Sequence, residues 1–283
     1  MKPLRWFPWN GSKRWLIDPL AQELRNYGGT GKYLDPFVGG GSVSFLMRQV
    51  HPSVPQAVSD ANPWLAACYE RQIARDFRVE LPDNLFDYEY WRALTDDLIG
   101  ELDLHDKVLR FAVCLTTAWG NRWKTETDGN FTKSSTPTNP KFTGHDYVRG
   151  KIEKFLQVQW LRPGLDQAMA ADWTRTVAEA EPGDLVYLDP PYPETLGYGS
   201  QVWSLNDMLD VIDWISDAVP KGIHVVASNV ADLERLYQRA GLRTFTVPCP
   251  TRSNTRRARV EVIGTSLPET ETIGIEHFFG VGS

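Results

Sequence analysis

The chain has little of what marks a membrane protein or a secreted protein. It holds no run of about 18 apolar residues, the length that a membrane-spanning helix needs. The opening stretch MKPLRWFPWNGSKRW has no apolar signal-peptide core. We therefore expect a cytoplasmic protein with no membrane contact.

Cysteine and histidine are also scarce, which argues against a disulfide scaffold and against a zinc module. The three cysteines, Cys68, Cys114 and Cys249, are widely spaced and form no CxxC pair, and the five histidines form no cluster. We expect reduced thiols and no metal site.

Positive charge is in deficit overall, but it is unevenly distributed. The net charge is −6. Residues 105–162 hold ten Lys and Arg against five acids, a net of +5, so the rest of the chain carries −11. A second basic group, Arg252, Arg256, Arg257 and Arg259, follows near the C-terminus. An acidic body with two basic regions favours a polyanion bound on one face.

Strands and helices alternate over most of the chain. Residues 32–37 read as a strand, followed by a glycine-rich turn and a helix from about Ser42. A second strand ends at Asp60 before a helix beyond Pro63. The rhythm resumes with strands at 185–188 and 223–229, helices at 205–219 and 232–240, and a closing antiparallel pair near 242–248 and 258–266. This order predicts an α/β fold with a largely parallel sheet covered on both faces.

A different segment interrupts that rhythm. Residues 85–162 contain helical stretches at 88–101, 106–118 and 147–156, and a polar loop, GNRWKTETDGNFTKSSTPTNPKF. So long a loop is typical of a functional element rather than a connector. We therefore predict a core of residues 1–80 and 163–283, with residues 81–162 inserted as a separate, mostly helical domain.

The stretch LDPPY ends a strand with an acid and a stiff backbone. Pro190 and Pro191 fix their own φ and restrict the residue before each of them, so the chain after Asp189 is held extended. A carboxylate and a rigid carbonyl that point the same way can accept hydrogen bonds from an exocyclic amino group. Tyr192 can stack on a base that has left its duplex. The motif predicts a clamp for the amino group of a base.

The stretch DPFVGGGSV places three glycines between a strand and a helix. Glycine permits a tight turn and a close approach of the backbone to a ligand. Asp60 ends the next strand, where a carboxylate can accept both hydroxyls of a ribose. The pair indicates a nucleoside cofactor, while the absence of GxGxxG and of a phosphate-binding lysine weighs against NAD and against a P-loop.

In this order the motifs resemble those of the Dam-type, D12 class, S-adenosylmethionine-dependent DNA adenine N6-methyltransferases. LRWFPWNGSK resembles the family's opening motif at Trp9, Gly11 and Lys13, but Asn10 and Ser12 depart from it. DPFVGGGSV, SDAN, AADW, LDPPY and VVASN are similar to the family's donor-binding and catalytic elements. GNRWKTETDGNFT and the arginine-rich RSNTRRARVEVIGTS resemble its DNA-contacting segments.

The resemblance implies a Rossmann-like methyltransferase core with a seven-stranded mixed sheet and an inserted target-recognition domain. Its implied partners are S-adenosylmethionine and double-stranded DNA, and no metal is implied. We expect the protein to act as a monomer or as a weak dimer on DNA. It assigns catalysis to Asp189, Pro190 and Tyr192. Donor binding falls to Trp9, Gly11, Lys13, Phe37, Gly39, Gly41, Asp60 and Asp172. DNA contact falls to Asn121, Arg122, Lys124, Asn130, Lys133, Arg252, Asn254, Arg256 and Arg257. Among these Arg122 is the best single candidate to reach a guanine edge, and phosphate binding is the equally ordinary alternative for it.

Three alternatives stay open from the residues alone. The acceptor could be cytosine N4 or adenine in RNA, because all of these present an exocyclic amino group. The chain could also be a DNA-binding relative without activity, although Asp189, Tyr192 and Asp60 are intact. An NAD-dependent enzyme would need a hydride-transfer pocket, which no motif supplies.

Overall fold

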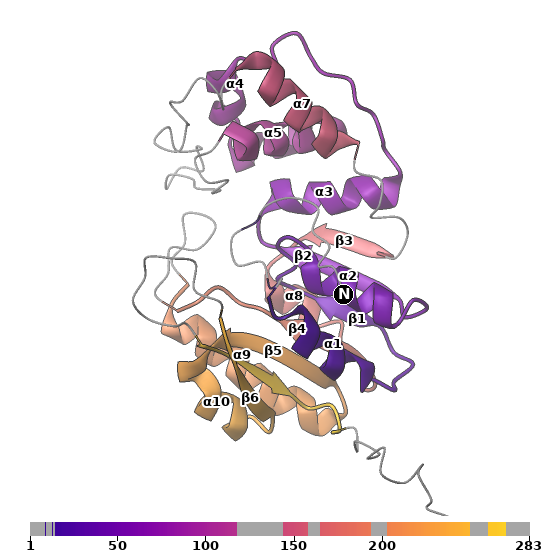
Figure 1. The fold of residues 1–283 in the computed structure, drawn as a ribbon, viewed down its shortest axis with the longest axis vertical. Helices are drawn as coiled ribbons and strands as arrows, with labels where there is room; N and C mark the ends of the chain where they lie inside the picture. The colour runs from indigo at the N-terminus through magenta and orange to yellow at the C-terminus, as the bar shows by residue number, and fades with distance from the viewer. Residues whose placement is uncertain are drawn as a thin grey trace, which may run out of the picture.

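A seven-stranded mixed sheet forms the centre of the protein in its computed structural model, which describes residues 9, 13, 15–117, 144–157, 165–193, 203–249 and 260–269 (Figure 1). The strands are β1 Tyr33–Asp35, β2 Gln56–Asp60, β3 Gln167–Ala170, β4 Leu185–Leu188, β5 His224–Val230, β6 Arg243–Pro248 and β7 Val260–Thr265. They lie side by side in the order β3-β2-β1-β4-β5-β7-β6. The five strands β1 to β5 are parallel, and β7 runs antiparallel between β5 and β6. The predicted α/β class, with its seven-stranded mixed sheet and closing hairpin, is confirmed.

The strand order reverses between β1 and β4. From β1 the chain builds outward through β2 to β3, and it then returns to β4 and builds the other way through β5. Parallel strands bring their carboxyl ends to one edge of a sheet. In open α/β sheets, ligands bind at that edge, at the point where the strand order reverses.

Helices cover both faces of the sheet. Helices α1 Ile17–Arg25 and α2 Ser42–Val50 pack on one face, while α8 Trp173–Val177, α9 Leu205–Ala218 and α10 Glu234–Arg239 pack on the other. Side chains alternate along each strand, so Tyr187 points to the first face and Val186 to the second. Each large apolar side chain buried in this way contributes about 1.5–3 kcal/mol.

Local capping fixes where two of the helices begin. Helix α3 Pro63–Ala74 starts at Asn62, whose Oδ1 accepts from the backbone N–H groups of Trp64 and Leu65 at 3.0 and 3.1 Å. The Ser204 side chain accepts from the Asp207 N–H, and the Asp207 carboxylate accepts from the Ser204 N–H, which closes a capping box at the start of α9.

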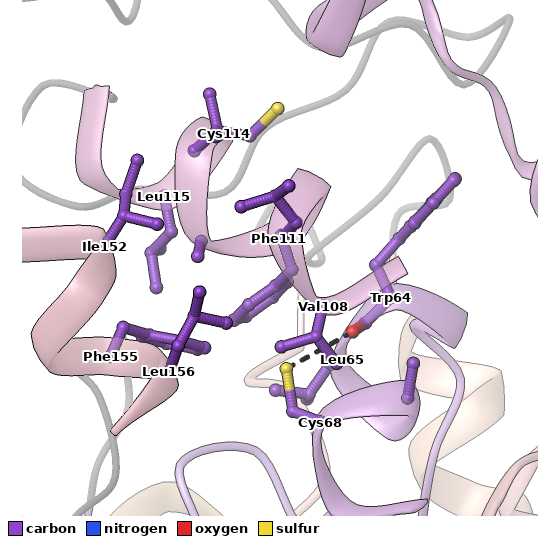
Figure 2. Packing of buried hydrophobic residues seen from close by; sticks show 14 of the residues in the cluster. Trp64, Leu65, Cys68, Val108, Phe111, Cys114, Leu115, Ile152, Phe155 and Leu156 are labelled. Atoms are coloured by element: carbon purple, nitrogen blue, oxygen red, sulfur yellow. Dashed lines mark hydrogen bonds between the residues drawn. The ribbon is translucent and has the colours of Figure 1, made fainter. Parts of the chain in front are cut away.

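A layer of helices begins with α3 and extends away from the sheet (Figure 1). It contains α4 Tyr88–Ala93, α5 Leu104–Thr117 and α7 His145–Leu156. Figure 2 shows its apolar packing, in which Phe111 of α5 lies between residues of α3 and α7. This helical layer, α3 with α4, α5 and α7, has one continuous hydrophobic core. The domain limits at residues 81 and 162 stay a prediction.

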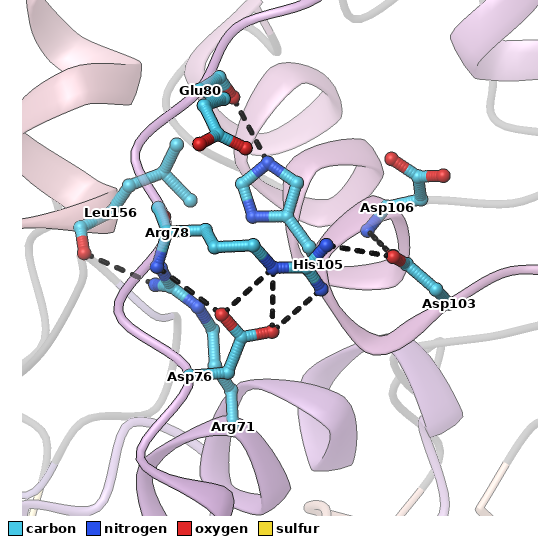
Figure 3. Close-up of polar contacts among 8 residues, drawn as sticks. All are labelled: Arg71, Asp76, Arg78, Glu80, Asp103, His105, Asp106 and Leu156. Atoms are coloured by element: carbon cyan, nitrogen blue, oxygen red, sulfur yellow. Dashed lines mark hydrogen bonds and ion pairs between the residues drawn. The ribbon is translucent and has the colours of Figure 1, made fainter.

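Two arginines, Arg71 in the interior and Arg78 at the exposed rim, tie the helical layer together (Figure 3). Arg71 of α3 donates to the carbonyl of Leu156 at the end of α7, at 3.1 Å, and to the carbonyl of Arg78. Arg78 forms ion pairs with Asp76 at 2.7 Å and with Asp103 at 2.9 Å. The segment after α3 is thereby fixed to the start of α5 and to the end of α7.

The structure departs from the predicted elements in three places. The predicted helix 88–101 is divided into α4 and a 3-10 helix, Asp96–Glu101, because Leu94 and Thr95 are extended. Thr95 is β-branched and disfavours the helix interior. The strand predicted at 32–37 covers only Tyr33–Asp35, since Pro36 has no N–H for the ladder. Strand β3 and helices α1 and α8 were not predicted, and β3 is short and only partly buried.

Candidate active site

Acidic side chains mark the carboxyl ends of three neighbouring strands. Asp35 is the last residue of β1, Asp60 is the last residue of β2, and Asp189 directly follows β4. Because these strands are parallel and adjacent, their carboxyl ends lie along one edge of the sheet, at the point where the strand order reverses. The candidate site is built on this edge.

The glycine turn after β1 is fixed against Asp60. Gly39 and Gly41 adopt positive φ, +46° and +71°, which strains any other residue. The Gly39 N–H donates to Asp60 Oδ2 at 3.1 Å, and the Asn62 N–H donates to Asp60 Oδ1 at 2.9 Å. A Cβ on Gly39 would lie 3.0 Å from the ring of Trp9. Four of the predicted donor residues therefore lie around one turn.

Two further predicted donor residues extend this group along the edge of the sheet. The Phe37 ring stacks on Trp173, with centroids 6.2 Å apart, and meets Trp203 edge to face at 5.6 Å. Asp172 is exposed and caps α8, where it accepts from the Thr174 N–H at 3.0 Å. It follows Ala171, whose N–H donates to the Asp60 carbonyl at 3.1 Å. Gly11 lies outside the described residues.

Lys13 reaches the LDPPY segment instead of the glycine turn. Its ammonium lies 2.9 Å from Asp189 Oδ1 and 3.3 Å from Glu261 Oε2, and it donates to the Tyr192 hydroxyl at 3.1 Å. The Tyr192 hydroxyl in turn donates to Glu261 Oε1 at 2.5 Å. We call Lys13, Asp189, Tyr192 and Glu261 the charged cluster. It joins the N-terminal segment, the end of β4 and the strand β7.

Strand β5 supports the DPPY segment from the side. The Asn229 amide donates to the carbonyl of Pro190 at 3.1 Å, which fixes the direction of that carbonyl. The Ser228 hydroxyl donates to Asp189 Oδ1 at 3.4 Å and forms a 2.7 Å hydrogen bond with the Tyr187 hydroxyl. The carboxylate and the carbonyl are therefore both held by neighbours on the sheet.

Burial sets the protonation of the three strand-end acids. It raises the pKa of Asp189 to about 6, against the opposing effect of Lys13. It raises the pKa of Asp60 to about 6 and that of Asp35 to about 7, against hydrogen bonds that favour the ionised forms. Burial alone would lower the pKa of Lys13, but Asp189, Tyr192 and Glu261 outweigh it and raise that pKa. Lys13 is therefore a cation at neutral pH.

Glu261 is a member of the charged cluster that was not predicted from the sequence. It is a single acid in the apolar strand β7, it is 5% exposed, and it lies opposite Val230 of β5. A charged residue at a buried strand position is the signal that could have revealed it. Ser228 and Asn229 belonged to a recognised motif but had no assigned role.

The predicted DNA-contacting residues, Asn121, Arg122, Lys124, Asn130, Lys133, Arg252, Asn254, Arg256 and Arg257, lie outside the described residues. Within the described ranges, no helix has the length and apolar character to cross a membrane. The described side chains also contain no group of three or more His, Cys, Asp or Glu arranged to hold a metal ion.

Parts of the chain are similar to known proteins. Residues 9–113 match the family model of the D12 class N6 adenine-specific DNA methyltransferase. The chain is 27% identical over 254 residues to the Type II methyltransferase M1.LlaDCHI of Lactococcus lactis subsp. cremoris, covering 81% of this chain and 83% of that protein. It is 24% identical over 203 residues to the Type II methyltransferase M.MjaIII of Methanocaldococcus jannaschii, covering 65% and 67%.

Among solved structures, a precorrin-6y C5,15-methyltransferase from Geobacter metallireducens GS-15 aligns over 90% of this chain and 88% of its own, at 10% identity. The TM-score of this alignment is 0.36, which is too low to show a shared fold. The family and the enzyme class predicted from the motifs are nevertheless confirmed by the family model, which matches residues 9–113, and by the two curated relatives, which are Type II methyltransferases.

Proposed function

We propose that this protein transfers a methyl group from S-adenosylmethionine to N6 of an adenine turned out of duplex DNA, within a specific sequence. One observation carries the proposal. The Asp189 carboxylate and the Pro190 carbonyl, each held by a residue of β5, follow β4 at the edge where β1 and β2 end. A clamp for an amino group thus lies beside a glycine turn suited to a nucleoside.

The glycine turn fits the methyl donor that the family implies. Its backbone lies close to Trp9, since a Cβ on Gly39 would lie only 3.0 Å from that ring, and Asp60 is oriented by two backbone N–H groups. Trp9, Phe37, Gly39, Gly41 and Asp60 would hold the donor, with Asp60 on its ribose. When bound, S-adenosylmethionine supplies an electrophilic methyl group on a sulfonium. The role of Asp172 near the donor's adenine belongs to the same proposal.

The DPPY segment would bind the target amino group. Asp189 Oδ and the Pro190 carbonyl each accept one N6 hydrogen, which turns the nitrogen lone pair away from the ring and toward the methyl group. The Asn229 amide occupies one lone pair of the Pro190 carbonyl, and the second remains for the base. The Tyr192 ring is held by its hydroxyl and is half-buried, so one face can stack on the base.

N6 gains the methyl carbon and gives up one proton during the transfer. Both hydrogens of the amino group already lie on acceptors, and of the two only the Asp189 carboxylate can take up a proton. Catalysis by these residues is positioning and electrostatic, since no bond forms between the protein and the base. Asp189 must be ionised to accept, so activity should fall as the pH drops through about 6, the value to which burial raises the pKa of Asp189.

Residues 81–162 would carry target recognition, together with the basic segment 252–257. Asn121, Arg122, Lys124, Asn130 and Lys133 are the proposed contacts in the first, and Arg252, Asn254, Arg256 and Arg257 those in the second. Replacing Arg256 and Arg257 by Ala should weaken DNA binding on every sequence and reduce the slope of log K against log salt by about one to two. An unchanged slope would remove this pair from the phosphate contacts.

The test is transfer of a labelled methyl group to DNA amplified with unmodified nucleotides, followed by digestion and mass identification of the nucleosides. N6-methyladenine is the expected product, and Asp189→Ala should yield none while it still binds S-adenosylmethionine. If the product were N4-methylcytosine, the amino-group clamp would stand, but the target base would be cytosine instead of adenine. Label in RNA alone, or donor binding without transfer to any nucleic acid, would overturn the proposal.

A further inference from the structure

Glu261 is an acid in a place that an apolar residue would fill at less cost. It lies on β7 between Val260 and Val262, and it is 5% exposed. Its neighbours across the sheet are Val230 of β5 and Val247 of β6. A buried carboxylate is costly unless it is paired, and pairing rarely makes it better for stability than an apolar side chain. Stability alone therefore does not account for Glu261.

The two oxygens of Glu261 are directed at the two groups that surround Asp189. Oε2 lies 3.3 Å from the Lys13 ammonium, and Oε1 accepts from the Tyr192 hydroxyl at 2.5 Å. Lys13 is already paired with Asp189 at 2.9 Å. One ammonium thus lies between two carboxylates, so the second acid is not needed merely to neutralise the lysine.

The ion pair between Lys13 and Asp189 bears on the proposed chemistry, because the ammonium partly neutralises the carboxylate that must accept a hydrogen of the target amino group. Lys13 and Ser228 both contact Asp189 Oδ1, so together they also set the direction in which the carboxylate faces. Lys13 is 3% exposed and cannot turn out to water without leaving the cluster. It can, however, shift toward Glu261, which is already within ion-pair distance.

Resting on the proposed function, we propose that Glu261 is a positioning residue for methyl transfer. It takes over the Lys13 ammonium and holds the Tyr192 hydroxyl, so that Asp189 accepts the hydrogen of the target amino group. In the absence of DNA, Lys13 spans both acids. When the base enters, Lys13 stays paired with Glu261, and the carboxylate of Asp189 faces the amino group.

Glu261→Gln tests this role because it keeps the size of the side chain and removes its charge. We expect kcat to fall about 10- to 100-fold, as for a reacting group that is slightly misplaced. Donor affinity and melting temperature should stay close to those of the wild type. Glu269→Gln is the matched control, since Glu269 is 79% exposed and lies 3.8 Å from Arg243. It should leave kcat unchanged.

The pH profile separates positioning from a structural role. Asp189 is faced by Lys13 from the N-terminal segment and by Glu261 from β7, with Tyr192, Asp35 and Tyr187 nearby. The charge of Glu261 is one of the causes that raise the pKa of Asp189. In Glu261→Gln the acid limb of the kcat profile should therefore move to lower pH. A limb that stays in place would contradict the proposal.

A double-mutant cycle with Lys13→Met completes the experiment. If Glu261 acts by holding Lys13, adding Glu261→Gln to Lys13→Met should change kcat much less than it does alone. An equal fall in kcat in both backgrounds would overturn the role of Glu261 but not the proposed function. An unchanged kcat in Glu261→Gln, with an active wild type, would do the same. A wild-type protein that binds the donor but methylates no DNA would overturn the proposed function itself, and this inference with it.

Discussion

The carboxyl edge of the sheet buries an ion pair, whereas the ion pairs of Arg78 in the helical layer lie at its exposed rim. At the edge, Lys13 and Glu261 form an ion pair with side chains only 3% and 6% exposed. In the helical layer, Arg78 and Asp103 pair at the rim, with side chains 42% and 53% exposed, around an apolar interior. Buried pairs add little stability because both ions lose water, and surface pairs add little because solvent screens them. The buried pair at the edge is therefore expected to serve the proposed chemistry, whereas the apolar side chains of the helical layer contribute stability.

Removing Asp189 should give the largest effect and should separate activity from stability. Asp189→Ala is expected to lower the rate of methyl transfer by at least about 10³-fold, because it removes an acceptor aligned with the reacting nitrogen. The remaining Lys13 and Glu261 form a neutral pair, so the folded protein should lose little stability. Transfer rate, donor binding by calorimetry and the melting temperature measure the three quantities. Asp210→Ala, on the exposed side of α9, is the control, and comparable losses in both variants would contradict the assignment.

Phe111→Ala should produce the reverse pattern, with a large loss of stability. Phe111 is fully buried, and its ring lies 5.8 Å from that of Trp9 and 6.0 Å from that of Phe155. The substitution is expected to lower the free energy of unfolding by about 3–5 kcal/mol, as measured by denaturant titration. Because Trp9 lies against Gly39 of the glycine turn that is proposed to hold the donor, donor affinity should also weaken.

Ile152→Ala is the control for that effect. Ile152 is a fully buried residue of α7 in the same apolar cluster, so its loss should destabilise the protein by about 2–5 kcal/mol. Donor affinity should stay unchanged in this variant. If the two variants weakened the donor equally, the contact through Trp9 would not be the cause.

The two regions should also respond differently to pH. Asp35, Asp60 and Asp189 have pKa values raised to about 7, 6 and 6, chiefly by burial. The folded state therefore binds protons that the unfolded state has lost, and the free energy of unfolding should rise as the pH falls from 7 toward 4. Hydrogen bonds from Arg78 lower the pKa of Asp76 to about 2, so its contribution is present above about pH 4 and is lost as the pH falls through 2.

Denaturant titrations between pH 7 and pH 2 test this, and stability should pass through a maximum. Asp35→Asn removes one of the acids with a raised pKa. It should flatten the slope between pH 7 and pH 5 by up to about 1.4 kcal/mol per pH unit. An unchanged slope would mean that Asp35 does not take up a proton in this range.

Features within a short stretch of sequence could be predicted, whereas contacts between distant parts of the chain could not. Asp60 and Asp189 could be predicted because each stands at the end of a strand within a short motif. The glycine turn is also a short motif, and it follows β1, which lies between β2 and β4 in the sheet. The contact between Lys13 and Glu261 joins the first and the last parts of the described chain and exists only once β7 has paired with β5. The division of the helix predicted at 88–101 depends on two residues, Leu94 and Thr95, whose extended backbone no periodic pattern encodes.

The smallest expected effect is at the rim of the helical layer. Arg78→Ala should lower the free energy of unfolding by less than about 1 kcal/mol, since its ion pairs are exposed, and the loss should shrink in high salt. Arg71→Met is the comparison, because Arg71 is fully buried and donates to the carbonyl of Leu156. That change leaves buried acceptors without a donor and should cost about 1–3 kcal/mol at any salt concentration. If Arg78→Ala cost as much as Arg71→Met, the rim would share the role of the interior, and the contrast between exposed and buried charges would fail in this layer.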